Sequence, residues 1–87
     1  MLDKVKMALR ITTNAYDTEL TRLIAAAKTD LGIAGVALPT TLDDICETAI
    51  ITYVKMMFGS PDEFDRLKAA YDEQKAQLSM SSAYTVW

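Results

Sequence analysis

A chain of 87 residues with 51% apolar and 24% charged residues suits one globular domain and is too apolar for a disordered protein. Its net charge of −3, from nine basic and twelve acidic residues, argues against nucleic acid as a main ligand, because phosphate binding depends on lysine and arginine clusters. The sequence shows no signal peptide and no apolar run near the roughly 18 residues that cross a bilayer. We therefore expect synthesis in the cytoplasm and no membrane contact.

The first helix is expected over residues 1–10, where Leu2, Val5 and Leu9 recur at helical spacing. A helix this short is marginal alone, so it must dock on the rest of the chain. Its local basic excess is interpreted as a solvated face, formed by Lys4, Lys6 and Arg10.

A second helix is expected to begin near residues 14–17, with Asp17 and Glu19 in a first turn where the helix dipole favours negative charge. Its apolar residues recur at steps of three and four, which predicts one buried face. That face consists of Leu20, Leu23, Ile24, Ala27 and Leu31. Gly32 is expected to end the helix in a left-handed conformation.

A third helix is expected after a loop over residues 33–40, with Thr41 as its N-cap and Gly59 as its stop. It carries the broadest apolar stripe, made of Leu42, Ile45, Cys46, Ala49, Ile50, Tyr53, Val54, Met57 and Phe58. Ile51 falls off this stripe, and an exposed isoleucine there would indicate contact with a second subunit. Residues 53–58 are interpreted as mostly core, with an adaptable methionine-rich contact surface as the alternative.

A fourth helix is predicted by Ser60, Pro61 and Glu63, which suit an N-cap, a first helical position and a capping box. Its inner face is expected to contain Phe64, Leu67, Tyr71 and Leu78, interrupted by Gln74. Its outer side is expected to carry two charge pairs at three-residue spacing, Asp65–Lys68 and Asp72–Lys75.

Residues 79–87 are expected to leave the helix as an extended tail, because serines are followed there by β-branched and aromatic residues. Tryptophan and tyrosine are enriched at interface hot spots, so the tail is a candidate contact segment. The alternative is that it covers the protein's own core. The candidate partner-binding residues are Ile51, Met80, Tyr84, Val86 and Trp87. The predicted fold is an all-α single domain over residues 1–87, a small bundle of about four helices with an extended C-terminal tail.

No catalytic residue, cofactor site or metal site is predicted, and we expect no enzyme. The chain has no histidine, which removes the commonest general base and metal ligand. Cys46 lies within an apolar stripe and is interpreted as a small core residue. The acidic pairs at residues 43–44 and 62–63 fall in first helical turns, where the helix dipole explains them without a metal.

The order of short motifs along the chain resembles one known family. The motifs are LDxVKxxLRI at residues 2–11, YDxEL at 16–20, LIxAA at 23–27, LDDI at 42–45, GSP at 59–61, YDEQKxxL at 71–78 and YTxW at 84–87. Together they resemble the small head–tail connector proteins, also called head-completion or adaptor proteins, of tailed double-stranded DNA phages and prophages. The resemblance spans nearly the whole chain.

The resemblance implies a virion protein that is made in the bacterial host cytoplasm. It implies a homo-oligomeric ring of about twelve copies beneath the portal protein, which extends the DNA channel and docks the tail-side head-completion protein. DNA would pass through without sequence-specific binding. The alternative is a small helical interaction or regulatory module without ring assembly. A helix-turn-helix DNA-binding protein is disfavoured, because the third helix is expected to expose mainly Asp44, Glu47, Thr48, Thr52 and Lys55.

Overall fold

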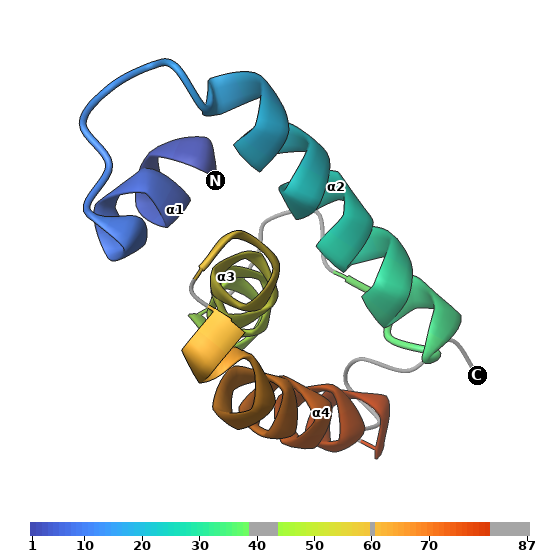
Figure 1. The fold of residues 1–87 in the computed structure, drawn as a ribbon. Coiled ribbons are helices and arrows are strands. Elements are labelled where there is room, and N and C mark those ends of the chain that lie inside the picture. The colour runs from blue at the N-terminus through green and yellow to red at the C-terminus, as the bar shows by residue number, and fades with distance from the viewer. Residues whose placement is uncertain (39–43, 60, 81–87) are drawn as a thin grey trace.

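The computed structural model describes residues 1–38, 44–59 and 61–80 of the chain. Its elements in chain order are α1 (Leu2–Leu9), α2 (Asp17–Ile33), α3 (Asp44–Phe58), the short 3-10 helix η1 (Pro61–Glu63) and α4 (Phe64–Met80). Helix α3 is central, with α2 and α4 packed on different sides of it and α1 against both α2 and α3 (Figure 1). The prediction of a small all-α bundle with four helices is confirmed.

The core is built around α3, whose side chains Cys46, Ala49, Ile50 and Val54 are fully buried. The other helices contribute Val5, Leu20, Ile24, Ala27, Leu31, Leu67, Tyr71 and Leu78, and Val36 joins them after α2. The interpretation of Cys46 as a core residue is confirmed. Burial of this apolar surface is the main force that holds the helices together.

Thr52 corrects the predicted outer face of α3, because it is buried rather than exposed. Three helices surround α3, so more than one side of it is covered. The buried hydroxyl donates a hydrogen bond to the carbonyl oxygen of Thr48 over 2.9 Å, which satisfies its polar group within the same helix.

Three apolar residues assigned to inner faces are exposed instead, namely Ile45, Met57 and Phe64. Ile51 departs from expectation in the opposite direction, since it is partly buried and packs against the core. The condition for a subunit contact at Ile51, an exposed side chain, is therefore only partly met. The predicted stripe extends too far toward both ends of α3, where the neighbouring helices leave Ile45 and Met57 exposed.

The end of α2 also differs from the prediction. Gly32 lies inside the helix, and Gly35 adopts the left-handed conformation with φ 90°. The amide of Val36 donates to the carbonyl oxygen of Leu31 over 3.0 Å, and that of Gly35 donates to Gly32 over 3.0 Å. This is the Schellman pattern, in which the residue after the C-cap adopts the left-handed conformation. The C-cap of α2 is Ala34, so the glycine in that position is Gly35.

Helix α1 ends with the same hydrogen-bond pattern but without glycine. Arg10 occupies the left-handed position at φ 59° and ψ 38°, while Ile11 donates to the carbonyl oxygen of Lys6 over 2.9 Å. A side chain in this conformation is strained relative to glycine. The buried side chain of Val5 and the ion pairs described next hold α1 in place despite that strain.

The predicted solvated face is right for Lys4 and Arg10, which are exposed, and wrong for Lys6, and both lysines also tie α1 to the bundle. Lys4 pairs with Glu47 of α3 over 2.7 Å, and Lys6 pairs with Asp17 of α2 over 2.8 Å. The Lys6 side chain is only 14% exposed and also donates to the side chain of Asn14 over 2.9 Å. Because these partners lie outside α1, the helical spacing within α1 could not indicate them.

The predicted charge pairs of α4 are wrong in their partners. Lys68 pairs with Asp72 one turn later over 2.8 Å, and Lys75 reaches Asp30 of α2 over 3.2 Å. The predicted tail boundary also moves, because Ser79 and Met80 belong to α4. The rest of the predicted tail, with Tyr84, Val86 and Trp87, lies outside the described residues, as do Thr41, Leu42, Asp43 and Ser60.

Candidate interaction surfaces

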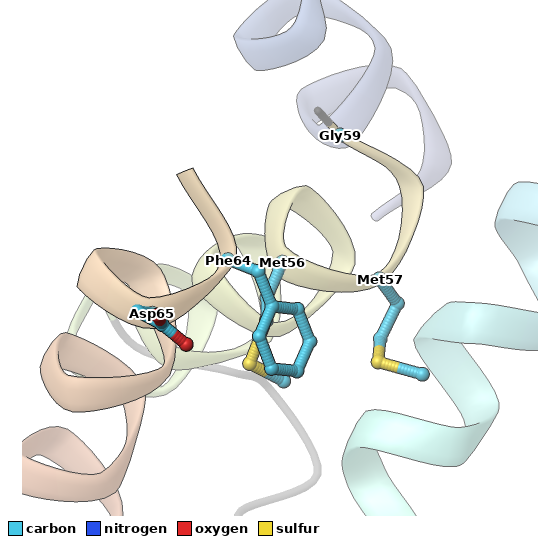
Figure 2. A pocket seen from close by; sticks show the side chains of 5 residues that line it. All are labelled: Met56, Met57, Gly59, Phe64 and Asp65. Carbon is cyan, nitrogen blue, oxygen red and sulfur yellow. The ribbon is translucent and has the colours of Figure 1, made fainter. Parts of the chain in front are cut away.

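An apolar groove lies at the corner where α3 ends and α4 begins. It has a volume of about 400 Å³ and is lined by Met56, Met57, Gly59, Phe64 and Asp65. Figure 2 shows the side chains of both methionines and Phe64 projecting from this corner, with Asp65 on the α4 side. The groove therefore has a mainly apolar lining with a single carboxylate.

Gly59 makes this corner possible. Its amide donates to the carbonyl oxygen of Lys55 over 2.8 Å, which satisfies the last turn of α3. A Cβ atom added at Gly59 would lie 2.5 Å from that same oxygen, closer than real Cβ contacts occur. The absence of a side chain thus lets the backbone turn tightly, so that Phe64 at the start of α4 comes back toward Met56 at the end of α3.

An aromatic pair adjoins the groove along α3. The rings of Tyr16, which precedes α2, and Phe58, the last residue of α3, meet edge to face with centroids 5.4 Å apart. Tyr16 is exposed and Phe58 is partly buried. Together with the exposed Met57, they make this end of the molecule rich in aromatic and methionine side chains. Such side chains adapt to and stabilise protein contacts.

A second, smaller opening of about 200 Å³ lies between α3 and α4, lined by Asp44, Ile45, Thr48, Gln74 and Gln77. The Oε1 atom of Gln74 is buried here and accepts no hydrogen bond within the described residues. Four of its five lining residues are polar in type, yet the surface that they expose to the opening is mainly apolar, and its exposed apolar residue is Ile45.

Three polar side chains join α2 to α4: Asp30 of α2 with Tyr71 and Lys75 of α4, here called the polar tie. Tyr71 donates its hydroxyl hydrogen to Asp30 over 2.6 Å, and Lys75 donates to the same oxygen over 3.2 Å. Burial alone would raise the pKa of Asp30, but the hydrogen bonds from Tyr71 and Lys75 and the charge of Lys75 outweigh it and lower the pKa. Burial and the bond to Asp30 raise the pKa of the Tyr71 hydroxyl, which therefore stays protonated. The tie is structural, because Tyr71 and Lys75 of α4 both bind the carboxylate of Asp30 on α2.

The predicted contact residues are separated by the fold. Ile51 is partly buried against the core, whereas Met80 is 77% exposed at the end of α4. Tyr84, Val86 and Trp87 lie outside the described residues. Sequence reasoning missed several exposed large apolar residues: Met7, Tyr16, Ile33, Ile45 and Phe64. A helical projection could have found Ile33, since it lies opposite the buried stripe of α2.

Within residues 1–38, 44–59 and 61–80, no three histidine, cysteine, aspartate or glutamate side chains gather where they could hold a metal ion. None of the described helices is long and apolar enough to span a bilayer.

The described surface thus belongs to a small helical domain with apolar openings at helix ends, a form that suits protein contacts. The chain matches the phage connector protein family over residues 1–85, and it therefore belongs to that family. This confirms the resemblance drawn from the sequence motifs and assigns the chain a structural connector role in phage particles. No curated protein and no solved structure matches the chain.

Proposed function

We propose that the chain is a head–tail connector subunit that assembles as a closed ring of about twelve copies beneath the portal. The observation that carries this proposal is the family match, which covers residues 1–85 and so includes every described helix. The ring extends the DNA channel of the portal and offers a docking surface to the next protein on the tail side. Its action is assembly rather than catalysis.

The chain's charge and chemistry support that role. A net charge of −3 suits a channel that lets DNA pass without holding its phosphates. The sequence has no histidine, and its one cysteine, Cys46, is fully buried in the core. We therefore propose a non-catalytic virion protein that binds the portal protein, the tail-side protein and its own copies.

The C-terminal residues Tyr84, Val86 and Trp87 are proposed to contact a neighbouring copy or the portal, because aromatic residues dominate interface hot spots. Deletion of residues 82–87 should leave the helical content unchanged and abolish assembly. Loss of helical structure in the truncated protein would instead show that the segment belongs to its own core. Circular dichroism and light scattering of the same sample separate these results.

The central experiment measures the mass of the purified protein by light scattering over a concentration series, with and without purified portal rings, and images large species by negative stain. Closed rings of about a dozen copies, alone or on the portal, are the expected result. A protein that stays monomeric or dimeric and does not bind the portal would favour the alternative, a small interaction or regulatory module without ring assembly.

A further inference from the structure

The outward faces of α2 and α4 have matching architecture. Each helix has 17 residues, and each packs its inner face on α3. The residues opposite the buried faces recur at steps of three and four, and all are exposed. The α2 stripe consists of Thr18, Arg22, Ala25, Thr29 and Ile33. The α4 stripe consists of Asp65, Ala69, Glu73, Ala76 and Met80.

Both stripes end in a large apolar side chain that the described fold leaves in water. Ile33 is 81% exposed at the end of α2, and Met80 is 77% exposed at the end of α4. The positions before them carry alanine and threonine, which are short enough for another helix to approach closely. Each stripe therefore presents short side chains beside an apolar end, with charged residues nearer its start, Arg22 on α2 and Asp65 and Glu73 on α4.

The charges of the two stripes are complementary. Arg22 has no ion-pair partner among the described residues, and the same holds for Asp65 and Glu73. The surroundings of the α4 stripe are acidic overall. From η1 through α4 the acidic residues are Asp62, Glu63, Asp65, Asp72 and Glu73, against Arg66 and Lys68, with Lys75 engaged at Asp30.

The two helices run toward the same end of the molecule, as Figure 1 shows. In a ring, neighbouring copies are related by rotation about one axis, and each contact joins two different faces. Because α2 and α4 lie on different sides of α3, such a contact can bring α2 of one copy beside α4 of the next, with both helices pointing the same way.

We propose that the outward stripe of α2 packs against the outward stripe of α4 in the adjacent copy, with a second copy of this chain as the partner. Aligned from their first residues, the stripes place Arg22 beside Ala69, between Asp65 and Glu73. The same alignment places Ile33 beside Met80, so both apolar ends are covered. This inference rests on the proposed ring and assigns its subunit contact.

Charge reversal tests the contact. In the presence of portal rings, Arg22→Glu should reduce the assembled fraction roughly tenfold or more, because it places like charges side by side. Adding Asp65→Lys and Glu73→Lys to that variant should restore assembly. Lys28→Glu makes the same charge change on α2 but off the stripe, and should assemble like the wild type. Circular dichroism confirms that each variant is folded.

Assembly of Arg22→Glu at the wild-type level would overturn the assigned contact and leave the proposed ring intact. So would failure of the compensating changes to restore assembly in a folded protein. A wild-type protein that forms no ring with or without the portal would overturn both the contact and the ring.

Cross-linking tests the pairing of the apolar ends directly. Ile33→Cys and Met80→Cys proteins are prepared separately, mixed under assembling conditions and oxidised with copper phenanthroline. A covalent dimer should form in the mixture and in neither protein alone, since Cys46 is fully buried. A dimer from either single variant alone would indicate a two-fold contact of like faces and overturn the proposal. Rings without a covalent dimer in the mixture would overturn it too.

Discussion

Helices α2 and α4 have the same length and the same partner, yet they bury different kinds of side chain. The inner face of α2 is aliphatic throughout, with Leu20, Ile24, Ala27 and Leu31 all buried. The inner face of α4 has fewer buried residues, of which Tyr71 also forms a hydrogen bond across to α2. Both helices share the polar tie, because its acceptor Asp30 lies on α2. The tie is a larger part of what anchors α4, since α2 buries four aliphatic side chains and α4 buries three residues, one of which is Tyr71 itself.

Truncation of a fully buried side chain in α2 should have the largest effect. Leu31→Ala should lower the free energy of unfolding by about 2–5 kcal/mol, because it removes buried methyl groups and leaves a cavity. Ile33→Ala, two residues along the same helix, is the matched control and should change it by less than about 0.5 kcal/mol. Urea denaturation measures both. Similar losses for the two variants would show that Ile33 is buried in the folded monomer.

Substitution of Gly59 at the corner between α3 and α4 should have the second largest effect on stability. Gly59→Ala should destabilise by about 1–3 kcal/mol, because its Cβ would be forced against the carbonyl oxygen of Lys55. Gly32→Ala is the control on α2, where no atom lies within 4 Å of the added Cβ, and it should stabilise by about 0.5–1 kcal/mol. Thermal denaturation should therefore shift in opposite directions for these two glycines. A shift in the same direction would contradict the difference in their surroundings.

Removal of the polar tie should weaken α4. Tyr71→Phe should lower stability by about 1 kcal/mol at neutral pH, less than the ~1.5–3 kcal/mol typical of bonds to charged groups. The expected loss of stability is smaller because the Asp30 side chain is 35% exposed, so solvent partly screens its charge. Tyr53→Phe is the control, since no hydrogen bond of its hydroxyl is found within the described residues, and it should cost less. Equal effects would exclude the Asp30 bond as the cause.

Acid should reduce the stability difference between the wild type and Tyr71→Phe. The folded-state pKa of Asp30 lies below its ordinary value of 3.8, so the unfolded chain takes up the proton first as the pH falls. The tie therefore contributes fully above about pH 4, and its contribution is lost as the pH drops through the lowered pKa. The stability gap between the wild type and Tyr71→Phe should narrow from pH 7 to pH 3. A gap that widened on acidification would contradict this sign.

The smallest expected effect concerns the interruption of the inner stripe of α4. Gln74→Leu should stabilise the protein by about 0.5 kcal/mol, because it removes a buried acceptor that lacks a hydrogen bond among the described residues. Gln77→Leu, on an exposed position of the same opening, should have no such effect. Chemical denaturation curves with matched slopes would resolve the difference. Destabilisation by Gln74→Leu would indicate that the amide has a necessary polar partner.

Local sequence signals were reliable where they depended on neighbours along the chain. The spacing of Leu20, Ile24 and Leu31 predicted the inner face of α2, and Gly59 was identified as the end of α3. They were unreliable where the answer lay in another helix. The partners of Lys6 and Lys75 lie on α2. A local signal also failed at the end of α2, where Gly35 rather than Gly32 adopts the left-handed conformation.

The candidate contact surfaces show the same division. Met80 was predicted as a contact residue and is exposed, whereas Ile51, a contact candidate on the condition that it is exposed, is partly buried and packs against the core. The groove around Phe64 was not anticipated, because it needs the turn at Gly59 to return the chain toward the end of α3. A periodic pattern gives the angle of a residue around its own helix, whereas exposure depends on which neighbours cover that angle.

The sequence by itself determined the helical class, the order of the helices and membership of the connector family, because each depends on periodicity and motifs read along one chain. Only the tertiary structure decided which faces remain open: α3 is covered by three helices, while α2 and α4 keep outward stripes ending at Ile33 and Met80. The physical reason is that burial is a relation between elements distant in sequence. The surfaces left for assembly are those that no other helix of the chain covers.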